Sequence, residues 1–465
     1  MTDLPDHIDP ACLGDQVFED ALEPVHLIRR SDVVLRAGTL MLSAGTSSLR
    51  VRELMRKAAA ALGLDGIHTS VSYTHIMATV SRRGIFRTQI AEAGHSGINA
   101  HRIQELQRMS NTLGERITAT ELDSRLSQIE STKPLYPLWL VTLFVGLACA
   151  SVTVLGHGGW REVLAVFPAS ALGFWFSRML ARHQVNHLAS VLATATVASG
   201  LFTAFTSALD AAMGDQSPRV AAGFICASIF LVPGFPLVTG GLDLTRLDLA
   251  AGIQRISYAV MVLVAITIGV WLVATVSGIM PGSVQPPEVS AWTRWLLRIL
   301  ASLVAVFGWA LVFNSPLPVA FAAAGIAVIG NAFRLLLLDY GLPAHIGAFF
   351  AGMVIGLACA VAGKWFGLEK IIMTVPTLLV LVPGSSALQT MLYFDQADVV
   401  LALSYGISTV LVIVAMIAGL GTARMLTDPE WAFTRPDPPS LVAVVKRQTL
   451  RVARRRARRQ GSPKR

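Results

Sequence analysis

The stretch LVPGFPLVTGG at residues 231–241 returns in outline as LVPGSSALQTM at residues 381–391, an offset of 150 positions. Each copy lies inside a strongly apolar run. Proline removes a backbone donor and clashes with the carbonyl four residues earlier, and the glycine after it permits a bend, so each copy should break a helix. In lipid, a freed backbone group is tolerated only beside protein or a watery cavity. The matched pair therefore predicts two discontinuous helices, although a Pro-Gly pair that only kinks a helix for packing remains an alternative.

The composition around these motifs is that of a membrane protein with soluble ends. Of 465 residues, 53% are hydrophobic and 14% are charged, whereas a soluble protein carries about 25% charged residues. Between residues 136 and 423 there are about ten apolar runs of the ~20 residues that a helix needs to cross a bilayer. We therefore expect a cytoplasmic α+β domain over 1–135, two five-helix membrane halves over 136–280 and 281–423, and a basic, disordered tail over 424–465.

The spacing of the motifs predicts an internal repeat. FPA at 167–169 and LPV at 317–319 keep the same offset of 150 and enter the second span of each half, while LVPG falls in the fourth. Five spans is an odd number, so two like halves in sequence face opposite ways across the membrane, as in the inverted repeats of secondary transporters. Two proteins fused end to end would give the same signal. The predicted fold is an α-helical polytopic membrane protein with about ten transmembrane helices in a 5+5 inverted repeat, preceded by a small α+β domain.

The distribution of Lys and Arg predicts the orientation. Cytoplasmic loops are enriched in these residues, and the acidic N-terminus has no leader-peptide pattern. With the N-terminal domain inside, the cytoplasmic loops hold Arg178, Arg182, Arg246, Arg255, Lys364 and Lys370, and the opposite loops hold Arg161, Arg219, Arg294 and Arg334. The basic tail also falls inside. We expect a multi-pass membrane protein with both termini in the cytoplasm.

Broken helices at matching places are the best sequence pointer to a transporter's binding site, because half-helix ends supply partial charges without ionised side chains. Ionisable groups at membrane depth are also usually functional. The candidate substrate-binding residues are Pro233, Gly234, Thr239, Asp243, Asn331, Arg334, Pro383, Gly384, Ser385 and Gln389.

Two of these candidates have alternative interpretations. Asp243 could hold a substrate ammonium or carry a proton, or it and Asp248 could form a loop salt bridge with Arg246. Arg334 could meet a substrate carboxylate or extend to the membrane interface.

The N-terminal domain has the pattern of a small α+β fold. Apolar residues at helical spacing run from Val51 to Leu62 and end at Gly63. IHTSVSYTHIMATV and IFRTQIA, joined by SRRG, read as a hairpin of two strands, and Thr118 with Glu121 reads as a capping box. AGTSS at 44–48 is typical of the turn that starts a helix.

Nothing in this domain indicates catalysis. His68 and His75, an odd number apart on one strand, would lie on opposite faces, so they would share no metal. There is no catalytic or nucleotide-binding motif. We expect a regulatory or gating domain, no enzyme activity, no catalytic residue, no cofactor, no metal site and no ATP-driven pump.

Three long stretches resemble the threonine/serine exporter family. They are RAGTLMLSAGTSSLRVRELMRKAAAALG at 36–63, LVPGFPLVTGGLDLTRLDLAAGIQRISYA at 231–259, and the segment from GNAFRLLLLDYG at 330 to LVPGSSAL at 388. The resemblance covers about 30–423. It implies a cytoplasmic N-terminal region, about ten membrane helices and export of small hydroxy amino acids driven by the ion gradient. Some relatives split the halves into two proteins, and one such pair resembles a dicarboxylate exporter. The Arg-rich tail departs from the family pattern.

The leading hypothesis is thus a secondary exporter of threonine or serine. The alternatives are a dicarboxylate (succinate) exporter and a membrane-anchored receptor or signalling protein that acts through its N-terminal domain. The partners that we expect are the lipid bilayer, the small-molecule substrate, protons as the coupling ion and anionic lipid headgroups at the tail, where each charge near the membrane contributes ~1 kcal/mol. We expect no nucleic acid. Cys149, Cys226 and Cys359 read as small hydrophobic residues.

Overall fold

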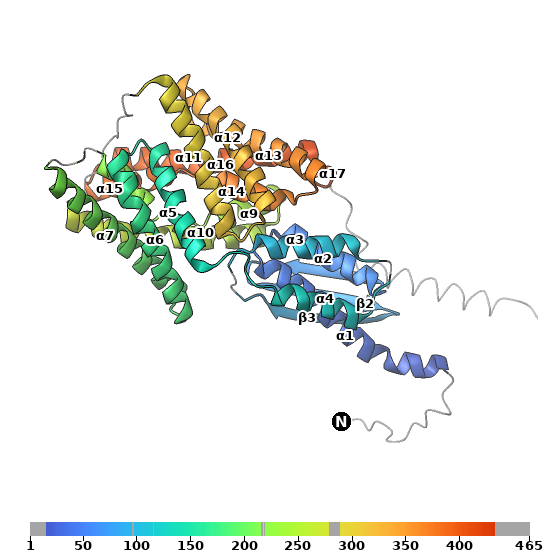
Figure 1. Ribbon diagram of the computed structural model, residues 1–465. Coiled ribbons are helices and arrows are strands. Elements are labelled where there is room, and N and C mark those ends of the chain that lie inside the picture. Colours follow the sequence, from blue (N-terminus) through green and yellow to red (C-terminus); the bar gives the residue numbers. More distant parts are fainter. Residues whose placement is uncertain are drawn as a thin grey trace, which may run out of the picture.

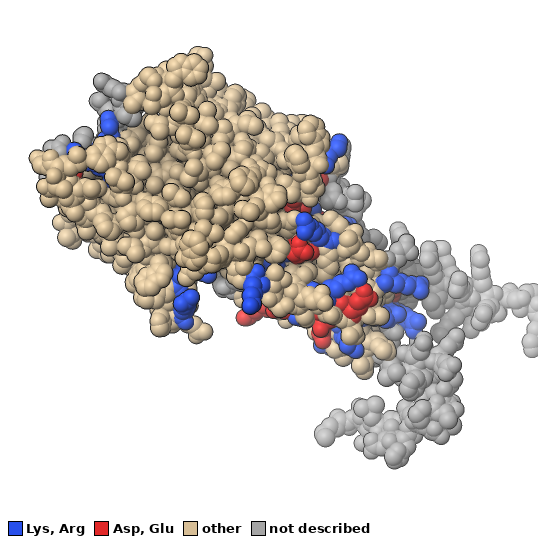
Figure 2. Space-filling view, in the orientation of Figure 1, with Lys and Arg blue, Asp and Glu red and all other residues tan. Residues whose placement is uncertain are grey.

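The structure, a computed structural model, consists of a helical body with a smaller α+β domain, here called the head, at one end (Figure 1). It describes residues 15–432 except 95–96, 115, 215–216, 218 and 279–288, and the predicted basic tail lies almost wholly outside that range. Charged side chains gather over the head, while most of the visible face of the body carries none (Figure 2). This division is the one that a membrane protein with a water-exposed domain requires.

Eight helices in the described part of the chain are long and apolar enough to cross a membrane unbroken. They are α5 (Leu138–Leu155), α6 (Trp160–Arg182), α7 (His187–Met213), α10 (Leu249–Ser277), α11 (Ala291–Val312), α12 (Leu317–Asp339), α13 (Ala344–Phe366) and α16 (Val399–Thr427). The predicted polytopic helical fold is confirmed.

The two LVPG motifs interrupt the helices that contain them. The first separates α8 (Val220–Cys226) and a 3-10 turn, η2 (Ile229–Leu231), from α9 (Gly234–Thr245), and the chain bends there by 69°. The second separates α14 (Lys370–Leu379) from α15 (Gly384–Asp395). The bent pair raises the number of spans to nine. The expected ten is reached only by counting α14 and α15 together, and each of these is too short to span a bilayer alone.

The end of each half repeats at the predicted offset. Helices α9 and α15 begin and end 150 residues apart and contain 12 residues each, and α10 and α16 also lie 150 apart with 29 residues each. The residues before these last two helices match as well. Asp248 and Asp398 are the N-caps, and Leu247 and Ala397 both have the left-handed φ of 60°. The last two helices of the second half therefore repeat the backbone path of the last two of the first. The expected FPA/LPV match at the same offset is wrong, because α6 and α12 begin 157 residues apart, so that Pro168 lies inside α6 while Pro318 lies at the start of α12.

The two halves run in opposite directions. Helix α9 ends at the head, where Ser48 donates to Asp243 at 3.0 Å. The end of α11 also meets the head, since the Ala100 amide donates to the Phe313 carbonyl at 2.8 Å. Helix α15, by contrast, lies in the part of the body far from the head (Figure 1). Helices α5 and α11, the first of each half, pack together. This is the arrangement of an inverted repeat.

The head contains four helices and a three-stranded antiparallel sheet of order β1-β2-β3. Its elements are α1 (Asp15–Ser43), α2 (Ser48–Ala61), β1 (Gly66–Val71), β2 (His75–Arg82), β3 (Ile85–Glu92), α3 (Ala100–Thr112) and α4 (Ala119–Ser131). The apolar positions predicted on α2 are buried. Thr118 caps α4 by accepting from the Glu121 amide at 3.2 Å.

The expected hairpin exists, but its first strand is two strands. Arg83 and Gly84, with φ of 49° and 86°, make the tight turn from β2 to β3. The segment before it turns at Ser72, whose hydroxyl accepts from the His75 amide at 3.1 Å. His68 and His75 consequently lie on different strands, and the prediction that placed them on one strand is wrong. Serine's ability to bond its own local backbone favours a turn inside this otherwise β-like run.

Candidate functional site

The two breaks pack against each other in a reciprocal way. A Cβ placed on Gly234 would lie 1.8 Å from Cδ2 of Leu379, and one placed on Gly384 would lie 3.3 Å from Cδ1 of Ile229. Leu379 and Ile229 each precede their own glycine by five positions, so they are equivalent residues of the two halves. Each glycine thus contacts the equivalent position of the opposite half, as a two-fold relation between the halves requires.

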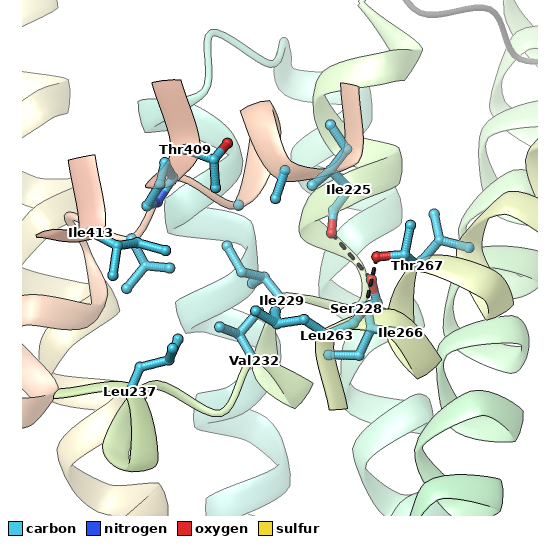
Figure 3. A pocket seen from close by; sticks show the side chains of 15 residues that line it. Ile225, Ser228, Ile229, Val232, Leu237, Leu263, Ile266, Thr267, Thr409 and Ile413 are labelled. Atoms are coloured by element: carbon cyan, nitrogen blue, oxygen red, sulfur yellow. Dashed lines mark hydrogen bonds between the residues drawn. The ribbon is translucent and has the colours of Figure 1, made fainter. Parts of the chain in front are cut away.

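Between the breaks lies a cavity of about 60 Å³. Its wall includes Val232, just before the first break, together with Pro383 and Gly384 of the second, and α10 and α16 complete it. Most of its side chains are apolar, among them Ile225, Ile229, Leu237, Leu263, Ile266 and Ile413 (Figure 3). These side chains give the wall little polarity of their own. Packing against neighbouring helices decides which face of a helix turns toward the cavity. Here the faces that carry Ile, Val and Leu turn toward it.

Three hydroxyls supply the polar part of this wall: Ser228, Thr267 and Thr409. Ser228 donates to the Ile225 carbonyl at 3.4 Å and Thr267 to the Leu263 carbonyl at 2.7 Å (Figure 3). Thr409 lies 2.9 Å from Ser386 Oγ and 2.8 Å from the Tyr405 carbonyl. Among the lining residues that the structure describes, none has an ionisable side chain. Helices α9 and α15 both begin beside this cavity, so partial positive charge from two helix starts reaches it.

The candidate residues are not all at this place. Pro383 and Gly384 line the cavity, and Pro233 and Gly234 form the break that packs beside it. The side chain of Ser385 lies outside the described part of the structure. Gln389 lies farther along α15 and is not in the cavity wall.

Thr239 and Asp243 lie near the head instead, in a buried ionic network. Asp243 and Arg255 are both 2% exposed, and Arg255 Nε lies 3.4 Å from Asp243 Oδ2. Arg255 also donates to Thr239 Oγ1 at 2.9 Å and to the Thr46 carbonyl at 2.8 Å. A buried pair needs such additional hydrogen bonds, because desolvation of two charges otherwise exceeds their attraction.

Residues of the head complete this network. Ser48, at the start of α2, lies 3.0 Å from Asp243 Oδ1 and 2.7 Å from Asp248 Oδ2. Asp248 also pairs with Arg52 of α2. In the described part of the structure, the ionic partners of Asp243 and Asp248 are therefore Arg255 and Arg52, rather than the Arg246 of the alternative interpretation. The Arg246 guanidinium lies 4.9 Å from the centre of the Trp431 ring.

Asn331 and Arg334 form a separate group. Asn331 Nδ2 donates to Ser302 Oγ at 2.8 Å, and Arg334 Nε donates to Asn331 Oδ1 at 3.0 Å. These contacts join α12 to α11. Because α11 reaches the head at its end and α12 leaves from there, this group lies in the part of α12 away from the head. It does not line the cavity.

Sequence reasoning missed Arg255, Ser48 and Thr46. Arg255 counted only as one more cationic residue of a cytoplasmic loop, and Ser48 only as part of a helix-start turn. Their importance comes from contacts across about 200 positions of chain, for which no local pattern exists. The sequence offers one indirect signal, the repeat offset of 150 residues. At that offset Asp243 corresponds to Tyr393 and Arg255 corresponds to Tyr405.

Two family models match most of the chain. The family described as "Putative threonine/serine exporter" matches residues 32–277, and "Threonine/Serine exporter, ThrE" matches residues 298–426. The "Probable succinate transporter subunit YjjP" of Escherichia coli is 30% identical over 250 residues, which are 53% of this chain and 93% of that protein.

More distant relatives are fungal. The "Pheromone-regulated membrane protein 10" of Eremothecium gossypii is 21% identical over 434 residues, covering 87% of this chain and 57% of that protein. No solved structure matches the chain. Because the first family match alone spans more than half of the sequence and the second covers most of the rest, the chain belongs to the threonine/serine exporter family.

Proposed function

We propose that the protein is a secondary active exporter of small hydroxy amino acids, threonine or serine, driven by the ion gradient across the membrane. One observation carries the proposal. Two helices broken at equivalent points of an inverted repeat meet at a single cavity. Such a meeting of discontinuous helices is where secondary transporters bind their substrates. A receptor that acts through its head has no need of it.

The chemistry of the cavity suits a small zwitterion. The Gly234 and Gly384 amides donate to the Val232 and Val382 carbonyls, and Pro236 has no amide. The Phe235 amide of α9 and the second and third amides of α15, which lack intrahelical partners, can hold a carboxylate, and the carbonyls that end η2 and α14 can hold an ammonium. The Ser228, Thr267 and Thr409 hydroxyls can exchange hydrogen bonds with a substrate hydroxyl. In this proposal Pro233, Gly234, Pro383, Gly384 and Ser385 shape the site.

The remaining candidates have supporting roles in the proposal. Asp243 is the buried carboxylate that could exchange a proton when its contacts with Arg255 and Ser48 loosen, which makes protons the proposed coupling ion. Thr239 holds Arg255 in place. Gln389, Asn331 and Arg334 would meet the substrate only along the way to or from the cavity.

The proposed setting is a bacterial inner membrane with both termini in the cytoplasm and the basic tail on anionic lipid. The bacterial relatives support a bacterial membrane as the location, and the fungal relatives show that similar proteins also occur outside bacteria. Lys and Arg at the head end of the body support the orientation (Figure 2).

A dicarboxylate is the second candidate substrate. The relatives called succinate transporter subunits favour it, and so does the approach of two helix starts to one cavity, since each could hold one carboxylate. The described part of the cavity wall contains no Lys or Arg, which favours the zwitterion.

Efflux from proteoliposomes tests the proposal. Vesicles with purified protein are loaded with labelled threonine, serine or succinate, and efflux is timed with and without an imposed proton gradient. The Gly384→Leu variant, whose side chain would fill the cavity, is the control for leakage. Gradient-dependent efflux of threonine or serine supports the first proposal, efflux of succinate alone replaces it with the second, and no efflux beyond the control refutes both.

A further inference from the structure

The inverted repeat gives the Asp243–Arg255 ion pair a counterpart in the second half. At an offset of 150, Asp243 corresponds to Tyr393 and Arg255 to Tyr405. These two tyrosines also contact each other, with ring centroids 5.4 Å apart and planes at 2°. Both pairs join a half-helix to the following span, α9 to α10 and α15 to α16. The same contact of the fold is thus made by two charges in one half and by two aromatic rings in the other.

The two pairs lie at opposite ends of the body. Asp243 is bonded to Ser48 of the head, whereas α15 runs away from the cavity toward the end far from the head (Figure 1). The cavity lies between them, because α9 and α15 both start at its wall and carry the pairs at their other ends. A substrate that crosses the membrane through the cavity moves perpendicular to the two-fold axis of the repeat, which lies in the membrane plane, and passes one pair on each side.

We propose that these pairs are the two closures of the transport path: the Asp243–Arg255 ion pair on the head side and the Tyr393–Tyr405 stack on the far side. The inference rests on the proposed transport function. In an inverted repeat, alternating access exchanges the conformations of the two halves. Equivalent contacts therefore break in turn, and one pair opens while the other holds.

The closures differ in strength, and the head accounts for the difference. The ion pair is almost fully buried, and Thr46 and Ser48 of the head bond to it directly. The stacked tyrosines are partly exposed, and an aromatic pair contributes only ~0.5–1.5 kcal/mol beyond its burial. Hydrogen bonds with the head stabilise the closure on the head side, so the closure on the far side is the easier one to open in this conformation.

Accessibility of a cysteine in the cavity tests the inference without any substrate. Ala387, in the cavity wall, is replaced by Cys in full-length protein in which Cys12, Cys149, Cys226 and Cys359 are replaced by Ala. A membrane-impermeant maleimide is then applied to right-side-out and inside-out vesicles. We expect Asp243→Asn and Arg255→Gln to raise labelling from the head side about tenfold, equivalent to about 1.4 kcal/mol, and Tyr405→Ala to raise it from the far side.

Matched controls separate closure from general loosening. Arg182→Gln changes an exposed arginine at the head-side end of α6, and Tyr340→Ala changes an exposed tyrosine at the far end of α12; neither should alter labelling. Ser48→Ala leaves both charges in place, so it keeps the test available if Asp243→Asn fails to fold. We expect a smaller rise, of about threefold, on the head side only.

The outcomes distinguish this inference from the proposed function. Unchanged labelling in Arg255→Gln, Ser48→Ala and Tyr405→Ala, or equal rises on both faces, overturns the closures even if amino acid efflux is normal. Side-specific labelling without efflux of threonine, serine or succinate supports the closures and refutes only the proposed substrates.

Discussion

Gly234 and Gly384 occupy equivalent positions but have unequal room. A methyl group at position 234 would overlap Leu379, whereas one at position 384 would meet Ile229 at 3.3 Å, a tight but tolerable contact. Overpacking of this kind costs ~1–3 kcal/mol. We therefore expect Gly234→Ala to lower efflux about tenfold and to reduce thermal stability, and Gly384→Ala to stay within about twofold of wild type.

A compensating change makes this prediction specific. Leu379→Ala removes the atoms that a methyl group at position 234 would meet, so the double variant Gly234→Ala/Leu379→Ala should recover part of the lost stability and efflux. Efflux from proteoliposomes and thermal unfolding in detergent measure both. Equal effects of alanine at the two glycines would show that the reciprocal packing has no such asymmetry.

The buried ion pair leads to a second expectation at the scale of single residues. Asp243→Ala leaves Arg255 without its carboxylate while 2% exposed, and breaking a buried pair costs ~3–5 kcal/mol. Arg255→Met leaves the opposite charge in the same position. We expect each single variant to unfold at a lower temperature, and the double variant to lose less than the sum of the two. Additive losses in this double-mutant cycle would mean that the two side chains do not stabilise each other.

At the scale of elements, proline position separates a break from a tolerated kink. Pro233 stands at the bend of 69°, whereas Pro168 lies inside α6, which continues through it. Replacing Pro233 by Ala restores a backbone donor and allows α8 and α9 to join as one helix. We expect this variant to fold with at least wild-type stability and to lose most efflux, because the start of α9 leaves the cavity.

Pro168→Ala is the matched control, and its efflux should remain close to wild type. Both variants are measured in the same proteoliposome assay, with thermal unfolding as the check on folding. Full efflux from Pro233→Ala would show that the discontinuity is not needed for transport.

The elements were largely predictable from sequence, and the site only in part. Apolar run length predicts the spans, and Pro-Gly at one offset predicts both breaks, because these signals are local. The apolar side chains of the cavity wall were not predicted, since the inward face of a helix depends on its neighbours. The contacts of Arg255 with Thr239 and Thr46 join three distant segments, and no local pattern of residues encodes them. His68 and His75 were misplaced because a turn at Ser72 divides an otherwise strand-like run.

For the whole molecule, the direction of insertion can be measured. If the head is cytoplasmic, single cysteines placed within 1–130 and 440–465 should resist impermeant reagents applied outside intact cells, and cysteines at 281–290 should react. The reason is that five spans separate the head from the connection between the halves, and five more return the chain to the head side. Labelling of the tail in intact cells would contradict the orientation.

The stability of the head, at the helix that contacts the body, should depend on pH. Arg50 of α2 pairs with Glu53 at 2.7 Å and with Glu369, in the loop before α14, at 3.3 Å. Although burial alone opposes ionisation of Glu53, the ion pairs with Arg50 and Lys57 hold the pKa of its carboxyl below the ordinary value. The stability that Glu53 contributes is therefore complete above its unfolded pKa of about 4.3 and is lost as the pH falls through the lower folded value.

Thermal unfolding between pH 6 and 3 checks this expectation. Glu53→Gln should be less stable than wild type at pH 6 and should lose less on acidification. Glu105→Gln is the control, because Glu105 pairs with Arg108, which is 64% exposed, and it should keep the wild-type slope. The same slope in Glu53→Gln as in wild type would remove Glu53 from the acid response.

The reciprocal glycine contacts also show why two different halves are needed. Gly384 packs on Ile229, so an upside-down copy of the first half, put in place of the second, would bring Gly234 to that same isoleucine. That glycine contact at the middle of the bilayer would be kept in such a homodimer. The ends of the body would not be compatible with it, because each copy carries a head and a buried carboxylate–guanidinium pair, and one head would have to be translocated to the opposite compartment. The head and the Asp243–Arg255 pair, which the second half lacks, therefore argue against an assembly of two oppositely inserted first halves.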